Sequence, residues 1–450
     1  MVLNIMVSAK PLYRVEDWLH DDLDGIAEKQ IHAAKYHDDR LARNLDGLFA
    51  ADRASFMVDL SAHAIREHQL ITQEIHNDST RITLMGAYPG GDPGAVKITH
   101  GHNKDHHADC KQIVLGLNIT GDGPVPLSYR LYDGNQADIT THPVNWQDLR
   151  EQLGKESFIY IADSKLCSDG NLRTIDENGG RFITVIPHNI CEVKQFLQRV
   201  RAGEAVTWQH RHNVPDSRKK GRFNAYRIHE GEPMDGYRIL WIHSAAKERQ
   251  EPSARERRIT QAESALKKVS PGLNRYRLKS RAQIEQAIKK AVHGAGPYLT
   301  VEIQEGTTVE QVQIGSGRPG PNTRYREEEK TSYRLEWTRN KAEISQAQRT
   351  DGFFPLVDNT TLEPVEVLKT YKNQPYLEKR FSTHKSVLEV APVFLKTSRR
   401  IEAMMFLYFI ALMWVSLIER RIRLEMQGQP IDRLPMRPDG SYTDKLLMAI

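Results

Sequence analysis

The feature that most constrains the fold is an apolar run that ends in a carboxylate, Phe158-Ile159-Tyr160-Ile161-Ala162-Asp163. A short continuous apolar run bounded by polar residues is typical of a strand buried on both faces. Such a strand would deliver Asp163 to the open end of a sheet, where α/β folds place their chemistry. The alternative is that Asp163 only caps the segment that follows.

The pattern around this run predicts an α/β or α+β sheet with helices on its faces. Further strands are expected at residues 70–78, 81–88, 112–119, 125–132, 182–186 and 351–357, and helices at 146–154 and 168–177. Residues 112–132 form a predicted hairpin, because a Gly-Asp-Gly-Pro turn separates two apolar runs. The β–α–β order after it predicts helices that cover the sheet.

Between residues 191 and 350 the chain is highly charged and does not continue this rhythm, so we predict an inserted domain there. The predicted organisation is listed in chain order: an N-terminal helical region (1–68), a first part of the core (69–190), the insertion (191–350), a second part of the core (351–426) and a tail (427–450). For the N-terminal region a packing unit, a DNA-binding role and a truncated remnant all stay open.

Composition indicates a folded globular chain of two or three domains, since 39% of its 450 residues are hydrophobic and 27% are charged. The net charge of +5 leaves room for a basic face that suits a polyanion. Three widely spaced cysteines have no metal-binding spacing, and we expect reduced thiols in a cytosol. No signal-peptide pattern opens the sequence.

The stretch Ala403–Ile418 raises the question of a membrane span, because sixteen apolar residues follow one another there. A span needs about 20 such residues. We therefore expect a buried core helix, with Ser398 as its N-cap, and no membrane association.

A histidine-rich loop over residues 100–107 suggests zinc, but its spacing fits no closed structural zinc site. We favour a surface loop that touches phosphates.

Three acids stand at strategic places: Asp78 at the predicted end of an early strand, Asp163 after the central strand, and Glu378 on a predicted helix far downstream. Converging carboxylates need counter-ions, and Mg²⁺ or Mn²⁺ is the natural choice for oxygen ligands. Two such ions about 3.5–4 Å apart can support an in-line phosphoryl displacement. The alternative for Glu378 is an ordinary amphipathic helix with solvated charges.

The pattern Tyr371-x2-Gln374-x3-Glu378-x6-Lys385 resembles the tyrosine–arginine–glutamate–lysine signature of DDE transposases. The resemblance is to the insertion-sequence-four superfamily of bacterial elements, in particular its sixteen-thirty-four branch. Further stretches resemble that branch in the same order, and they are residues 100–112, 126–135, 161–163 and 399–403. The likeness covers residues 70–426.

The resemblance implies an α/β fold with a ribonuclease-H-like core, in which a mixed sheet carries helices on both faces, interrupted by a large mixed insertion domain. It implies Asp78, Asp163 and Glu378 as catalytic metal ligands for two Mg²⁺ or Mn²⁺ ions. It also implies cleavage at insertion-sequence ends and strand transfer into target DNA, by a homodimer on double-stranded DNA in the bacterial cytoplasm, at the nucleoid. The expected DNA contacts are Lys385, Tyr371 and the basic cluster Arg218, Lys219, Lys220 and Arg222.

Two departures from the signature stand at its centre. Gln374 replaces the usual arginine, so a cation that could contact DNA is missing, and Pro375 predicts a helix start that leaves Tyr371 outside it. Two alternatives therefore stay open: another ribonuclease-H-like nuclease without strand transfer, and a catalytically dead DNA-binding relic.

Overall fold

The structure is a computed structural model of the 450-residue chain. It describes residues 1–8, 10–22, 32–88, 91–101, 110–136, 138–215, 223–275, 277–314, 318–321, 323–374, 380–381 and 395–425. The chain divides into two compact units, of which the first holds residues 1–187, 230–240 and 355–450 and the second holds 188–229 and 241–354. The second unit overlaps the predicted insertion, whose boundaries stay a prediction.

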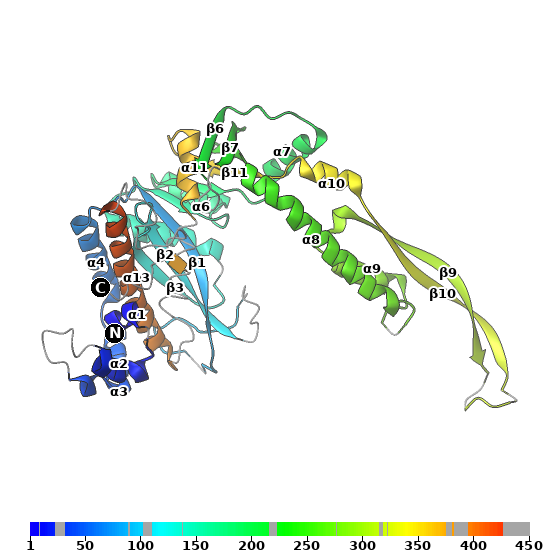
Figure 1. The fold of residues 1–450 in the computed structure, drawn as a ribbon, viewed down its shortest axis with the longest axis horizontal. Helices are drawn as coiled ribbons and strands as arrows, with labels where there is room; N and C mark the ends of the chain where they lie inside the picture. The colour runs from blue at the N-terminus through cyan, green and yellow to red at the C-terminus, as the bar shows by residue number, and fades with distance from the viewer. Residues whose placement is uncertain are drawn as a thin grey trace. The chain divides into compact units, whose positions relative to one another are not determined.

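A nine-stranded mixed sheet is built from strands far apart in sequence (Figure 1). Its spatial order is β3-β2-β1-β4-β5-β11-β8-β7-β6. The strands are β1 (Glu74–Leu84), β2 (Lys111–Thr120), β3 (Pro126–Tyr132), β4 (Ile159–Ala162), β5 (Arg181–Val185), β6 (His210–Pro215), β7 (Phe223–Glu230), β8 (Arg238–Ser244) and β11 (Phe353–Asp358). Since β6, β7 and β8 extend this sheet, the segment predicted as an insertion contributes strands to it.

Strand direction changes across the sheet. β1, β2 and β3 pair antiparallel as the predicted hairpin requires, whereas β1, β4 and β5 are parallel and β11 is antiparallel to β5. Gly134 allows the chain to turn closely after β3, because a Cβ there would lie 2.1 Å from the backbone oxygen of Gln112. The sheet is therefore mixed, as predicted.

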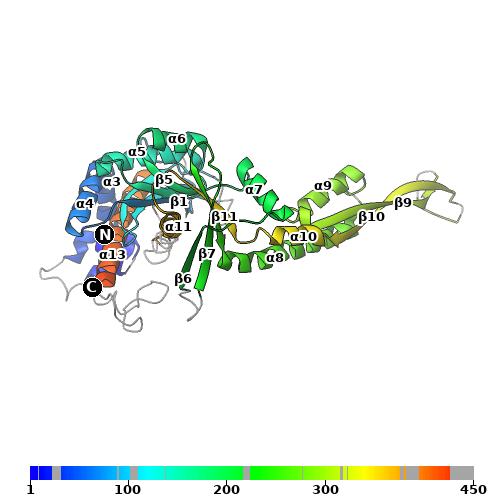
Figure 2. The ribbon, with the colours of Figure 1, turned by 90° about the horizontal axis from the view of Figure 1, so that it is seen from above.

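Helices cover both faces of the sheet in the first unit. They are α5 (His142–Leu153), α6 (Asp169–Glu177), α11 (Pro364–Lys372) and α13 (Ser398–Glu425). Figure 2 shows α5 and α6 on one side of β1 and β5, and α11 on the other. The apolar strand predicted around Phe158 is β4, and the side chains of Phe158, Tyr160 and Ile161 are fully buried between these layers.

One strand differs from its prediction. Two strands were expected on either side of residues 79–80, but β1 runs unbroken from Glu74 to Leu84. Its pairing with β2 continues through Asp78 and Ser79 without a break. The polar run His76–Thr80 resembles a turn in composition, and the ladder of hydrogen bonds to an apolar β2 overrides that local preference.

The N-terminal region is helical in its described part: α1 (Val2–Val7), α2 (Val15–Asp22), α3 (Asp38–Ala50) and α4 (Arg53–Glu67). It is tied to α13 by ion pairs. Arg400 donates to both carboxylate oxygens of Asp46 at 2.9 and 2.7 Å, and Arg53 pairs with Glu402 at 3.1 Å.

Helix α13 contains the apolar stretch that raised the question of a membrane span. Its length and composition would allow a span, but 89% of its most apolar window is buried within the structure. That burial is typical of a core helix, as predicted. Ser398 is the first helical residue rather than the N-cap, and the carboxylate of Asp92 accepts hydrogen bonds from its hydroxyl and from the Arg399 N–H at 3.0 and 3.1 Å.

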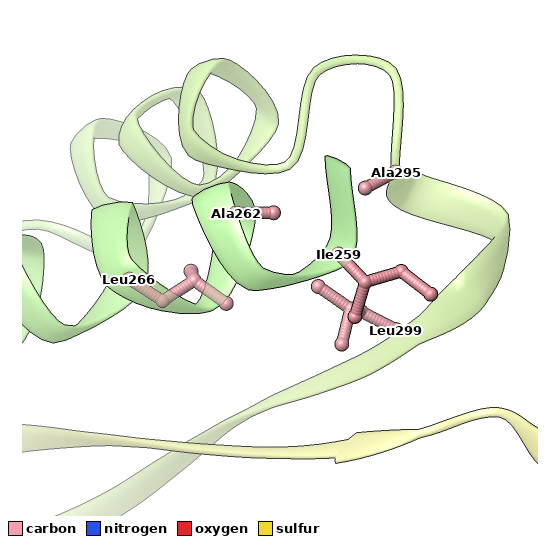
Figure 3. Close-up of a cluster of buried hydrophobic side chains, with 5 residues drawn as sticks. All are labelled: Ile259, Ala262, Leu266, Ala295 and Leu299. Carbon is pink, nitrogen blue, oxygen red and sulfur yellow. The ribbon is translucent and has the colours of Figure 1, made fainter. Parts of the chain in front are cut away.

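The second unit has a core of its own. Its helices are α7 (Cys191–Ala202), α8 (Ala245–Val269), α9 (Arg281–Ala291) and α10 (Lys341–Gln348), and its long strands β9 (Leu299–Gln313) and β10 (Tyr325–Arg339) form a two-stranded sheet. The apolar face of α8 packs on the start of β9, as Figure 3 shows for Ile259, Ala262, Leu266, Ala295 and Leu299. Short 3-10 helices lie at Leu12–Arg14, Ala33–Tyr36, Asp138–Thr141, Ser270–Gly272 and Gly296–Tyr298.

Candidate active site

Asp78 lies in the middle of β1 rather than at a strand end, and this corrects the prediction. It stands opposite Leu117 of β2, and its side chain is half-buried. The N–H of Ser79 donates to Asp78 Oδ1 at 2.7 Å. The continuous ladder on β2 therefore fixes the backbone of this acid.

Asp163 follows the last residue of β4 directly, as predicted. Its backbone oxygen accepts from the Thr184 hydroxyl at 2.7 Å and from the Leu166 N–H at 3.1 Å. Its carboxylate Oδ1 accepts from the Lys165 N–H at 2.9 Å. The turn after β4 thus holds the carboxylate of Asp163 in a defined direction at the end of the strand.

The strand register favours a close approach of the two acids. β1 and β4 are parallel, and their pairing ends with His76 opposite Ile161. Asp78 and Asp163 each follow two residues later, so a continued register would set them at the same level and on the same face. Neighbouring strands lie about 4.8 Å apart. Burial is the main reason that the pKa of Tyr160 is raised, and the charges of Asp163 and Asp78 raise it further.

A buried polar network fixes β1 from the face that α5 covers. Asn77 donates to Asn118 on β2 at 2.8 Å, and Asn118 exchanges hydrogen bonds of 2.9 Å with Asn145 on α5. Asn145 also donates to the Tyr160 hydroxyl on β4 at 2.9 Å. Because its members satisfy one another in a dry interior, such a network specifies one arrangement of the strands.

The end of α11 fixes β1 from the opposite face. The Thr370 hydroxyl donates to Glu74 at 2.9 Å. Gln374, two residues after α11, contacts the His76 ring at 3.0 Å and donates to the Asn77 backbone oxygen at 2.9 Å. His76 is 1% exposed, and burial lowers its pKa to about 4.

Several predicted site residues lie outside the described residues: Glu378, Lys385, Arg218, Lys219, Lys220 and Arg222, with residues 102–107 of the histidine-rich loop. Tyr371 is described, and it lies in the last turn of α11, which ends at Lys372 before Pro375. The helix start predicted at Pro375 lies outside the described residues. Asp78 and Asp163 are described and belong to neighbouring parallel strands or their ends, and Tyr371 stands three residues before Gln374.

Sequence reasoning treated Gln374 only as a missing arginine, and it did not single out His76. The structure gives Gln374 two hydrogen-bonding partners on β1. A glutamine can both donate and accept, whereas an arginine only donates. The sequence shows that a glutamine stands where the family has an arginine. It does not show that the side chain at position 374 contacts a strand about 300 residues earlier.

The donor set at the paired acids suits a hard cation. Carboxylate oxygens are the ligands that Mg²⁺ and Mn²⁺ prefer. Asp78 and Asp163 each accept a backbone N–H through Oδ1. In the part of the chain that the structure describes, one cluster of three ligand-type side chains lies close together, and it consists of His37, Asp38 and Asp39.

Comparison with known families decides the class. Residues 73–414 match the family described as "Transposase DDE domain", and this range contains both paired acids. The chain belongs to the DDE transposase family. It is therefore a member of a phosphoryl-transfer enzyme family that typically uses divalent metal ions.

The N-terminal residues 1–62 of this transposase match a second family, a domain of unknown function named DUF4277. That match covers most of the helical region before β1. No curated protein matches the sequence.

Two solved structures are similar to the transposase at a distance. The Mos1 transposase paired-end complex with left transposon end is 10% identical, with a TM-score of 0.18, over 39% of this chain and 58% of that chain. The piggyBac transposase synaptic complex with hairpin DNA is also 10% identical, with a TM-score of 0.26, over 98% of this chain and 77% of that chain. This chain thus spans little more than half the length of the Mos1 chain.

Proposed function

We propose that this chain cleaves DNA at the ends of an insertion sequence and joins the freed 3′ ends to target DNA. We place it in the insertion-sequence-four superfamily, in its sixteen-thirty-four branch, with a ribonuclease-H-like core. The observation that carries the proposal is the parallel pairing of β1, which carries Asp78, with β4, which leads to Asp163. Family membership supplies the class of chemistry.

Glu378 is the proposed third ligand. The pairs Thr370–Glu74 and Gln374–His76 advance four positions, from α11 to the residue Gln374 after its end, for every two positions on β1. By this count along the sequence, position 378 is the next one to be matched with position 78, and we propose Glu378 on that ground.

In this proposal Asp78, Asp163 and Glu378 hold two Mg²⁺ or Mn²⁺ ions, which when bound would activate the attacking oxygen and stabilise the leaving one. The protein's part is to fix the acids on rigid strands and to orient DNA. Lys385, Tyr371 and the cluster Arg218, Lys219, Lys220 and Arg222 would contact DNA phosphates. We propose a homodimer on DNA, in the cytoplasm at the bacterial nucleoid.

Substitution of the acids tests the site. Asp163→Ala and Glu378→Ala should each abolish Mg²⁺-dependent cleavage of terminal-repeat DNA, while DNA affinity in a gel-shift assay stays close to that of the parent. Asp169→Ala, an exposed acid at the start of α6, is the matched control and should cut at the parent rate. Cleavage by both site variants at the parent rate would refute the assignment.

Two further assays separate the alternatives. Supplied with pre-cut ends, a transposase joins them to target DNA, whereas another ribonuclease-H-like nuclease cuts without joining. A dead relic would show salt-sensitive DNA binding without Mn²⁺ uptake, and electron paramagnetic resonance of Mn²⁺ added to the DNA-free protein detects that uptake.

A further inference from the structure

The last turn of α11 and the residues after it are joined to β1 at successive positions. Thr370 reaches Glu74, and Gln374 reaches both His76 and the backbone of Asn77. Glu74, His76 and Asp78 share one face of β1, since their spacing is two. Among the described residues, these contacts advance along the strand from Glu74 to Asn77, the residue before Asp78.

The direction of each hydrogen bond follows from the chemistry of the groups. The Asn77 carbonyl only accepts, so the Gln374 amide nitrogen must face it at 2.9 Å. That orientation turns the Gln374 carbonyl toward His76 Nδ1 at 3.0 Å, and Nδ1 must therefore carry the proton. Nε2 of the buried ring is then an acceptor, and none of the described residues forms a hydrogen bond with it.

Resting on the function proposed above, we infer that Gln374 and His76 are a positioning pair, which fixes the chain at Gln374, four residues before Glu378, against the stretch of β1 that leads to Asp78. Gln374 precedes Glu378 by four residues, and His76 precedes Asp78 by two. Each member of the pair therefore precedes one of the proposed metal ligands by only a few residues in the sequence. Neither side chain needs to touch metal or DNA for this role.

The pair also explains the departure from the arginine of the family signature. An arginine at position 374 could donate to the Asn77 carbonyl, but it has no atom that accepts the His76 Nδ1 proton. Glutamine offers both functions at once. The residue at this position is thus matched to His76 rather than being only a lost cation.

The Mn²⁺ affinity of the DNA-free protein, measured by electron paramagnetic resonance, tests the positioning role of the pair and does not depend on an activity assay. Gln374→Leu keeps the size of the side chain and removes both hydrogen bonds. We expect its dissociation constant for Mn²⁺ to rise about tenfold, the order expected when one or two hydrogen bonds are lost. Asn373→Ala, one residue earlier, is the control and should bind as the parent does.

Three more variants sharpen the result. His76→Phe should weaken Mn²⁺ binding to the same degree, and the double variant should be no weaker than either single one, because both remove the same contact. Gln374→Arg should also weaken Mn²⁺ binding. Parent-like Mn²⁺ affinity in Gln374→Leu, or additive losses in the double variant, would overturn the inference.

The tautomer of His76 gives a readout that needs neither metal nor DNA. In a protein with ¹⁵N-labelled histidine, the signal absent from His76→Phe belongs to His76. We expect Nδ1 protonated in the parent and a changed tautomer signal in Gln374→Leu. An Nε2-protonated ring in the parent would contradict the pair.

Asp163→Ala distinguishes this inference from the proposed function. If Asp163→Ala binds Mn²⁺ like the parent, the metal site itself is wrongly assigned. If Asp163→Ala loses Mn²⁺ while Gln374→Leu keeps parent affinity, the site stands and the positioning pair fails.

Discussion

At the scale of single residues, the site depends on how its neighbours hold β1. Asp163 was predictable because a buried strand leads directly to it. Asp78 was predicted as a site residue, but at the end of a strand and not in its middle. The reason is that the run His76–Thr80 lacks strand-like composition. Only the pairing with β2 and the polar contacts on both faces keep that run extended.

Asn118 is the centre of the buried network behind Asp78. Asn118→Leu would leave Asn77, Asn145 and Ser128 without the partners they now have. Each buried polar group left unsatisfied costs about 1–3 kcal/mol. We expect the free energy of unfolding in urea to fall by at least about 2 kcal/mol, and Gln147→Ala on the exposed side of α5 to change it little. An unchanged urea midpoint for Asn118→Leu would show that the network does not stabilise the fold.

His243 predicts a pH dependence for the second unit. Its ring lies between Trp208 and Phe353, with Arg227 at 3.3 Å and Glu248 at 3.5 Å, and Glu251 acts on it from α8. Burial, and after it the charge of Arg227, lowers the pKa of His243 below its usual 6.5. The unfolded chain therefore binds a proton more readily than the folded one. This contribution to stability is complete above about pH 6.5 and is lost as the pH falls below that value.

Thermal unfolding midpoints measured between about pH 7.5 and about pH 5.5, on either side of the ordinary histidine pKa, check this expectation. The parent should lose more stability on acidification than His243→Phe, which keeps a ring between Trp208 and Phe353. Equal losses in both proteins would exclude His243 as the cause.

At the scale of elements, α13 organises the first unit. Its apolar side chains are buried against β3 and the N-terminal helices, and Tyr129 stacks near Phe406 and Phe409. The sequence indicated a core helix from length alone. It did not indicate that α13 also carries a buried acid, Glu419, which forms an ion pair with Arg380 just after the predicted position of Glu378.

The Arg380–Glu419 pair predicts an asymmetric response to mutation. The two side chains are 1% and 2% exposed, and Arg380 also donates to the backbone oxygen of Pro124 at 2.8 Å. Glu419→Ala would leave a buried charge uncompensated, and we expect a loss of about 3–5 kcal/mol in the free energy of unfolding. The double change Arg380→Met with Glu419→Leu should recover most of that loss, because neither charge remains.

Urea titration of the parent, of Glu419→Ala and of the double variant measures these changes in the free energy of unfolding. Glu425→Ala, an exposed acid at the end of α13, serves as the control. A double variant as unstable as Glu419→Ala would mean that the packing volume, rather than the unpaired charge, decides the loss.

At the scale of the whole molecule, each of the two units is built from segments that are separated along the chain. Residues 230–240 lie within the predicted insertion, and they group with the first unit. Within that unit, Arg238 donates to both oxygens of the fully buried Asp358 at 3.1 and 2.8 Å. We therefore expect that residues 191–350 cannot be removed without damage to the first unit.

Two deletions test this organisation. Replacing residues 191–350 by a short linker removes Arg238 and leaves Asp358 buried without its partner, so we expect an aggregating product without a cooperative unfolding transition. Replacing only residues 307–331 by an Asn-Gly turn shortens the ribbon beyond Gly306 and Ser332, a pair in register, and should leave the unfolding midpoint unchanged. A soluble, cooperatively folding product from the larger deletion would contradict the assignment of residues 230–240.

The sequence by itself determined the class of fold, the strand that leads to Asp163, the core helix and the family resemblance, because hydrophobic periodicity and short motifs are local properties. Tertiary structure decided which strand lies beside β4, that Asp78 stands in mid-strand, and that Gln374 reaches His76. These depend on contacts between residues up to about 300 positions apart, where pairing, burial and hydrogen-bond geometry override local preference. The sequence thus named both Asp78 and Asp163 as candidate acids, and the tertiary structure showed that the strand carrying Asp78 pairs in parallel with the strand that ends before Asp163.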